Sequence, residues 1–148
     1  MKSKIIQNNL FFEEIAKRIV EGERVRIRAK GNSMLPLIRD GKDEIILEKP
    51  NEQSFLKGRL LLVRLRDNKY ILHRVKGFDN TNLTLQGDGN LSIVETCSSH
   101  FVIAEAVAVI RNGKTIRIGS LQWNAYRYLW PKGYLLRRIC LGIYKRMF

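Results

Sequence analysis

Three short stretches of the chain carry residue types that together could cleave a peptide bond. In chain order, Ser33 lies in residues 31–36 (GNSMLP), His73 in residues 70–75 (YILHRV), and Asp88 in residues 87–90 (GDGN). A serine hydroxyl is a poor nucleophile near neutral pH, but an imidazole that takes its proton, oriented by a carboxylate, activates it. The pattern therefore predicts a nucleophile at Ser33, a general base at His73 and an orienting carboxylate at Asp88.

Each of these residues also has a purely structural interpretation. Ser33 would then be a loop serine that caps the turn at Pro36, His73 a buried strand histidine, and Asp88 an ordinary turn residue. Asp43 is a second candidate for the carboxylate that orients His73. A base on a strand is held rigidly, and an ordinary histidine pKa near ~6.5 makes neutral imidazole available at neutral pH, which favours the catalytic interpretation of His73.

The neighbours of these residues have predicted supporting roles. Met34 is expected to bury its side chain beside the nucleophile, and Pro36 restricts the residue before it to extended geometry, which helps to hold a tight turn. Arg74 follows His73 in a predicted strand, so its side chain should point to the opposite side of the sheet and form a structural ion pair.

The motifs resemble those of a known family, the type I signal peptidases and their LexA-like relatives. In that family the nucleophile opens a Ser-Met-x-Pro turn, matched by residues 33–36, and the base opens a base-Arg-Val triplet, matched by residues 73–75. A histidine in place of the usual bacterial lysine is similar to the endoplasmic-reticulum and archaeal branch, whose Gly-Asp-Asn-like box is matched by residues 87–90. The resemblance covers about residues 31–90.

The resemblance implies a fold, an activity and a substrate class. The fold would be mainly β (α+β), with a coiled antiparallel sheet or small barrel of the signal peptidase/LexA type. The activity would be that of a serine endopeptidase that uses no metal or cofactor. Its substrate would be an extended peptide or precursor protein, cleaved at a leader or signal-type sequence with small residues near the cut.

Two departures from the family pattern keep a second interpretation open. Many signal peptidases have a hydroxyl residue where this chain has Gly31, which leaves the backbone N–H of Ser33, with Asn32 as a substitute, to stabilise the oxyanion. Arg59 occupies a position that is often acidic. These departures favour, as an alternative, a catalytically impaired peptide-binding module. A self-cleaving LexA-like regulator is a further alternative, but no helix-turn-helix is evident ahead of Ser33, so no specific nucleic-acid partner is expected.

Composition limits the remaining possibilities. A chain of 148 residues with 45% hydrophobic residues fits one globular domain. Its 27 Lys and Arg against 14 Asp and Glu give a net charge of +13, which favours an anionic partner. No acidic residue follows Glu105, so the C-terminal part is strongly basic.

The chain has few residues that could form disulfides or bind metals, and it has no long apolar run. The two cysteines, Cys97 and Cys140, are compatible with a reducing compartment, and Cys97 with His100 lacks the two further ligands of a metal site. No secretory signal is evident, and no apolar run approaches the ~18 residues of a membrane-spanning helix. The expected location is therefore cytoplasmic or peripheral at a membrane.

Hydrophobic periodicity divides the chain into three parts. Residues 1–22 are expected to hold an amphipathic helix that is capped near Asn8 or Asn9 and ends at Gly22. Residues 23–118 form the β-rich catalytic domain. Its predicted strands cover an alternating stretch near residues 24–30 and residues 44–48, 59–65, 70–76, 83–87, 101–110 and 115–118.

The third part, residues 119–148, is expected to be a basic amphipathic helical tail. Aromatic residues lie near its middle and basic residues flank its apolar stripe. Such a stripe fits the headgroup layer of an anionic membrane, but it would equally pack on the domain itself or on a second copy in a homodimer.

Overall fold

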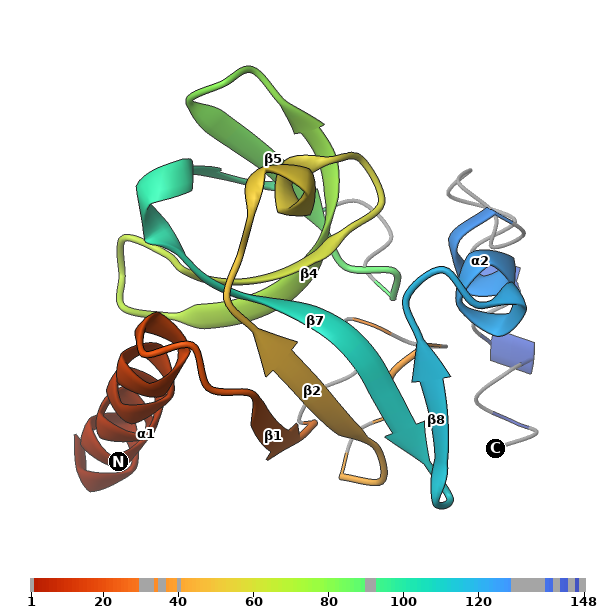
Figure 1. Ribbon diagram of the computed structural model, residues 1–148, viewed down its shortest axis with the longest axis horizontal. Coiled ribbons are helices and arrows are strands. Elements are labelled where there is room, and N and C mark those ends of the chain that lie inside the picture. The colour runs from red at the N-terminus through yellow and green to blue at the C-terminus, as the bar shows by residue number, and fades with distance from the viewer. Residues whose placement is uncertain are drawn as a thin grey trace.

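The computed structural model (Figure 1) describes residues 2–29, 34, 37–39, 41–89, 93–128, 138–139, 142–143 and 146. Its helices are α1 (Lys2–Val20) and α2 (Leu121–Tyr128), with two short 3-10 turns, η1 (Glu52–Phe55) and η2 (Ser99–Phe101). The strands are β1 (Val25–Arg28), β2 (Glu44–Glu48), β3 (Leu60–Arg64), β4 (Tyr70–Phe78), β5 (Asn82–Gln86), β6 (Glu95–Ser98), β7 (Val102–Arg111) and β8 (Lys114–Arg117). The protein is mainly β, as the sequence predicts.

The eight strands form one sheet in the order β1-β2-β7-β3-β4-β5-β6, with β8 also paired to β7. Every described pairing is antiparallel. The long strand β7 links the two halves, because it pairs with β3 through its first residues and with β2 and β8 through its last ones. Figure 1 shows β7 crossing the middle of the molecule between these partners.

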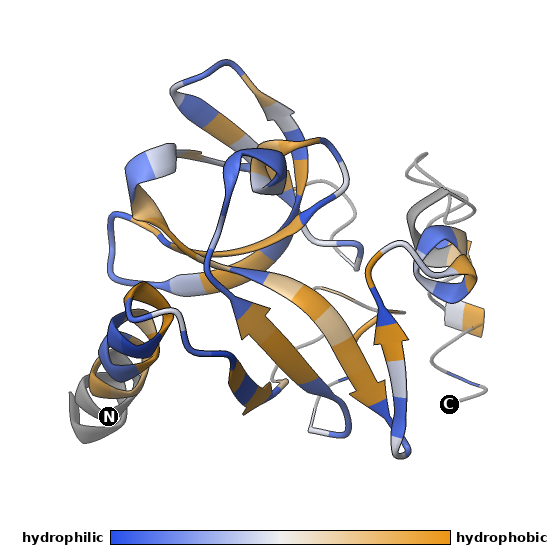
Figure 2. Cartoon of the chain, in the orientation of Figure 1, coloured by the Kyte–Doolittle hydropathy of each residue, from blue (hydrophilic) through white to orange (hydrophobic). Residues whose placement is uncertain are grey.

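Buried side chains form two apolar clusters. The larger one gathers under α1 and α2 and includes Ile19, Leu47, Leu60 and Trp123, and the smaller one includes Leu61. Successive residues of a strand point to opposite faces, so Leu60 and Leu61 lie in different clusters. Because β3 is buried on both faces, its residues are apolar almost throughout (Figure 2). Strand β4, which pairs with β3, is likewise buried on both faces around residues 73–75.

The N-terminal helix extends further than predicted. It begins at Lys2, so the prediction that Asn8 or Asn9 caps it is wrong. Residues 2–9 contain no glycine or proline that would stop the helix there. Its end agrees with the prediction, since Gly22 follows in the left-handed conformation at φ +86° and its N–H donates to the carbonyl of Ile19 at 2.9 Å.

The C-terminal tail is described only in part. Helix α2 confirms a helix directly after residue 119, and the side chain of Trp123 is buried in the larger apolar cluster. This tryptophan packs on the domain and not on another surface. Within the described residues, no helix is both long enough and apolar enough to cross a membrane.

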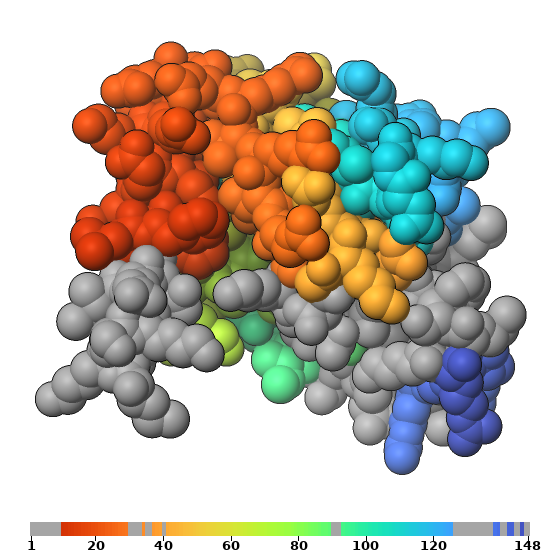
Figure 3. Space-filling model, turned by 90° about the horizontal axis from the view of Figure 1, so that it is seen from below, coloured from red at the N-terminus to blue at the C-terminus, as the bar shows by residue number. Residues whose placement is uncertain are grey.

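The lower side of the molecule is seen in Figure 3. There the orange segment that contains β1 lies at the surface, between α1 in red and the β7–β8 hairpin in cyan. Among the described strands, β1 pairs only with β2, so it forms one edge of the sheet.

Candidate functional site

The predicted base, His73, lies in the middle of β4 with only 3% of its surface exposed. Its Nδ1 is 2.9 Å from Oε2 of Glu95, the first residue of β6. Val75, Leu85 and Glu95 lie opposite one another on β4, β5 and β6, and His73 is two residues before Val75 on the same face. Glu95 therefore reaches His73 across the intervening strand.

This hydrogen bond determines which ring nitrogen of His73 can accept a proton. A carboxylate only accepts hydrogen bonds, so the Nδ1–H of the neutral ring donates to Glu95 and the lone pair lies on Nε2. Among the residues that the structure describes, Nε2 has no hydrogen-bond partner. The ring is thus oriented by Nδ1, and Nε2 is the nitrogen that could accept a proton.

The electrostatic environment keeps this imidazole neutral at pH 7. Burial disfavours the charged ring and lowers the pKa of His73 below its ordinary value. The negative charges of Glu95 and, more weakly, Asp88 oppose that effect without cancelling it. A neutral base is the form that proton abstraction requires.

Asp88, the predicted orienting carboxylate, binds a different partner. Its Oδ1 and Oδ2 accept hydrogen bonds from Nε and Nη2 of Arg74 at 2.7 and 2.6 Å. Arg74 also donates to the carbonyl of Gly58 at 2.9 Å, and both side chains of the pair are almost fully buried. Arg74 thus forms the ion pair that the sequence predicts for it. The hydrogen bond to His73 that the sequence assigns to Asp88 is made by Glu95.

The residue after the predicted nucleophile is anchored next to this ion pair. Met34 is buried, and its Sδ accepts a hydrogen bond from the backbone N–H of Asp88 at 3.4 Å. Met34 therefore contacts the residue that holds Arg74, whose side chain lies on the face of β4 opposite to His73. Ser33 itself, with Asn32 and Pro36, lies outside the described residues.

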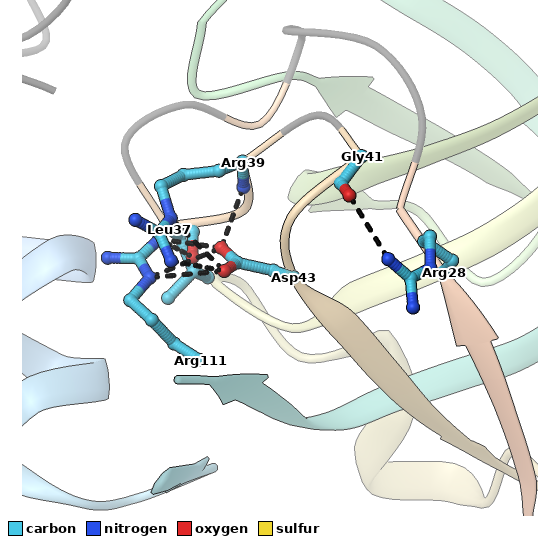
Figure 4. Close-up of polar contacts among 6 residues, drawn as sticks. All are labelled: Arg28, Leu37, Arg39, Gly41, Asp43 and Arg111. Carbon is cyan, nitrogen blue, oxygen red and sulfur yellow. Dashed lines mark hydrogen bonds and ion pairs between the residues drawn. The ribbon is translucent and has the colours of Figure 1, made fainter. Parts of the chain in front are cut away.

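Asp43 holds the segment that follows the Ser33 turn (Figure 4). Its carboxylate is fully buried and accepts hydrogen bonds from the backbone N–H and the guanidinium of Arg39 at 2.8 to 3.1 Å. It also accepts one from Nη2 of Arg111 at 2.8 Å. Arg111 also donates to the carbonyl of Leu37 at 2.9 Å. The alternative that Asp43 orients His73 is therefore wrong, because two arginines occupy its carboxylate. Burial alone would raise the pKa of Asp43, but the hydrogen bonds from Arg111 and Arg39 outweigh burial and lower it.

The basic residue that departs from the family pattern has a structural partner. Arg59 donates to Oε1 of the buried Glu105 on β7 at 2.7 Å, and the hydroxyl of Ser54 donates to its other oxygen at 2.8 Å. Arg59 therefore compensates a buried carboxylate.

Comparison of the chain with protein-family models, with curated proteins and with solved structures finds no match. The chemistry must therefore be argued from the residues above. Within the described residues, the geometry brings together a buried histidine and a glutamate that orients it, and it anchors Met34 beside the Arg74–Asp88 pair on the opposite face of β4.

Glu95 is the partner of His73 that the sequence analysis missed. It lies beyond the 87–90 box, in a short polar strand whose residues give no clear alternation. One signal was available, because Glu95 is the only acidic residue between Asp88 and Glu105.

Two other features lie apart from His73. A pocket of about 150 Å³ between α1 and the β3–β4 hairpin is lined by side chains that include Phe12, Glu13, Arg64 and Tyr70, and none of the site residues above lines it. Within the described part of the chain, no three His, Cys, Asp or Glu side chains gather as metal ligands would.

Proposed function

We propose that this protein is a serine endopeptidase that resembles signal peptidases and cleaves a leader or signal-type peptide. Ser33 is the nucleophile, His73 the general base and Glu95 the residue that orients the base. The observation that carries the proposal is the 2.9 Å hydrogen bond between His73 and Glu95, which leaves Nε2 available. We also assign the antiparallel sheet to the signal peptidase/LexA type, on the order of the three motifs.

The proposed reaction follows from the orientation of the imidazole. Ser33 Oγ attacks the carbonyl carbon of the scissile bond while His73 Nε2 takes the hydroxyl proton. The carboxylate of Glu95 stabilises the imidazolium, and the backbone N–H of Ser33, with Asn32, stabilises the oxyanion. His73 then gives the proton to the leaving amine, and a water molecule activated by the same ring hydrolyses the acyl-enzyme.

Two strand edges are suited to hold an extended substrate. Residues 70–72 of β4 pair with β3 on one side, whereas the described pairing with β5 begins only at Arg74. Strand β1 has one edge that no described strand covers, and it ends five positions before Ser33. A peptide that adds as a strand to such an edge gains main-chain hydrogen bonds and presents alternate side chains to the protein.

The buried ion pair of Arg74 and Asp88 supports the site without reacting. It ties β4, the strand that carries His73, to Asp88, whose backbone N–H contacts Met34. Because both of its charged groups are bonded and buried, neither is available for proton transfer. Its role is to position the two halves of the site.

A digestion experiment tests the proposal. The full chain is incubated with a library of extended peptides, and the cleaved bonds are identified by mass spectrometry at about pH 6 to 9, a range chosen around the ordinary histidine pKa. We expect cleavage next to small residues by the wild type and none by Ser33→Ala. No cleavage by the wild type at any pH, combined with peptide binding by fluorescence anisotropy, would show a binding module instead.

A further inference from the structure

The edge strand β1 carries a row of arginines on its exposed face. Arg24 immediately precedes β1, and Arg26 and Arg28 alternate with Val25 and Ile27, which pack in the larger apolar cluster. The three arginines therefore share the outer face of the sheet. Figure 3 shows the segment that contains them at the surface.

Contacts with β2 hold this row in place. Arg26 binds both oxygens of Glu44, at 2.6 and 2.9 Å, and Arg24 forms an ion pair with Glu48. Arg28 donates to the carbonyl of Gly41 at 3.3 Å (Figure 4). More than half of the side-chain surface of Arg24 and Arg26 remains exposed. The row is thus oriented from one side and accessible from the other.

Positive charge exceeds negative charge on this face. Glu44 and Glu48 match two of the three arginines, and within the described residues no carboxylate forms an ion pair with Arg28. The strand register continues the face from Arg26 through Ile46 and Ala108 to the exposed Arg117 on β8. Arg28 lies opposite Glu44 in the register, so Glu44 faces two arginines, and the four arginines of this face exceed its two glutamates by two charges.

We propose that the peptide substrate is acidic at alternate positions and pairs along the edge of β1 that no described strand covers, an inference that rests on the proposed endopeptidase function. A strand added to this edge would place every second side chain about 4.5–5.5 Å from the arginine row. Carboxylates match the guanidinium group in charge and geometry. The intervening substrate side chains would lie on the side of Val25 and Ile27, whose apolar surroundings favour apolar substrate residues.

The distance along the chain places this recognition close to the cut. Arg28 and Ser33 are five residues apart, and a fully extended chain of that length spans at most about 17 Å. Arg28 therefore contacts substrate residues within about five positions of the scissile bond, and Arg26 and Arg24 contact residues further away. Exposed ion pairs such as Arg26 with Glu44 are weak, so a substrate carboxylate can share or exchange these partners.

A binding experiment with three matched peptides tests the inference. Each peptide has small apolar residues at alternate positions, with Glu, Gln or Lys at the others, and binding to the full-length Ser33→Ala variant is followed by fluorescence anisotropy. We expect the Glu peptide to bind about tenfold more tightly than the Gln peptide at low salt, with the preference reduced as salt increases. The Lys peptide should bind most weakly.

A charge reversal then locates the contact. Arg28→Glu should abolish the preference for the Glu peptide, whereas Arg66→Glu makes the same charge change in the exposed β3–β4 turn and should preserve it. Equal effects of the two variants would overturn the inference, because they would indicate a general effect of net charge. Binding of duplex DNA with the same dependence on Arg28 would assign the row to nucleic acid and also overturn it.

The experiment separates this inference from the proposed function. Equal binding of the Glu and Gln peptides, with cleavage of both by the wild type, would contradict acidic recognition and leave the endopeptidase intact. If the wild type cleaves none of the peptides in the library or in this set, the proposed function fails and the inference fails with it.

Discussion

His73 and Arg74 are neighbours in β4, and each binds a carboxylate, but the two pairs differ in what they leave available. Arg74 and Asp88 form two hydrogen bonds, with 4% and 3% of their side chains exposed. His73 and Glu95 form one, and Glu95 is 17% exposed. The first pair is saturated, whereas the second leaves Nε2 without a described partner. The alternation of one strand thus separates a saturated ion pair on one face from the proposed catalytic pair on the other.

The largest expected effect is the loss of activity when His73 is replaced. His73→Ala should reduce kcat/KM for a cleaved peptide by about 10⁴-fold or more, as much as Ser33→Ala, and the double variant should be no worse, since residues of one catalytic unit are not additive. Steady-state kinetics measure this, and circular dichroism checks that each variant is folded. Substantial activity in His73→Ala would show that the imidazole is structural.

Disrupting the pair of Arg74 and Asp88 should lower the stability of the protein. Asp88→Asn leaves a buried guanidinium without its counter-ion and should lower the free energy of unfolding by about 3–5 kcal/mol. Urea denaturation measures the loss. Glu44→Gln on the exposed pair with Arg26 is the matched control and should move the midpoint little. An unchanged midpoint in Asp88→Asn would remove the structural role assigned to this pair.

Glu95→Gln should affect activity and its pH dependence more than stability. A glutamine can donate to Nδ1 and favour the wrong tautomer, so kcat should fall about a hundredfold or more. Activity needs the neutral ring, so it is present above the pKa of His73 and lost as the pH falls through it. Glu95 raises this pKa, so its removal should shift the acid limb of kcat/KM to lower pH. An unchanged limb, or one shifted to higher pH, would contradict the pairing.

The smallest effect concerns the segment after the Ser33 turn. Arg111→Lys keeps the charge but loses the forked contact with Asp43 and Leu37, so the free energy of unfolding at pH 7 should fall by about 1–2 kcal/mol. The pKa of Asp43 is lower in the folded state than in the unfolded chain. The ionised carboxylate therefore stabilises the fold at pH values above its ordinary pKa, and this contribution is lost as the pH falls through its pKa in the folded state. The difference between variant and wild type should therefore shrink in acid. A difference that is independent of pH would exclude the Asp43 contact as its cause.

Local patterns predicted most of the fold but only part of the site. Alternating apolar residues indicated the strands, and adjacency in β4 correctly placed Arg74 away from His73. Long-range pairing could not be read in the same way. Glu95 is 22 residues from His73 in the chain, and Arg111 is 68 residues from Asp43. Only the sheet brings the members of each pair together. The early start of α1 was missed because an asparagine suited to capping does not end a helix that can continue through it.

The central claim is that Ser33 and His73 act as one unit, and covalent labelling tests it most directly. The full chain is treated with a fluorophosphonate, and the modified residue is identified by peptide mapping with mass spectrometry. The proposal predicts one adduct, on Ser33, that is lost in His73→Ala and formed more slowly in Glu95→Gln. Modification of another residue, or labelling of Ser33 at the same rate without His73, would contradict it.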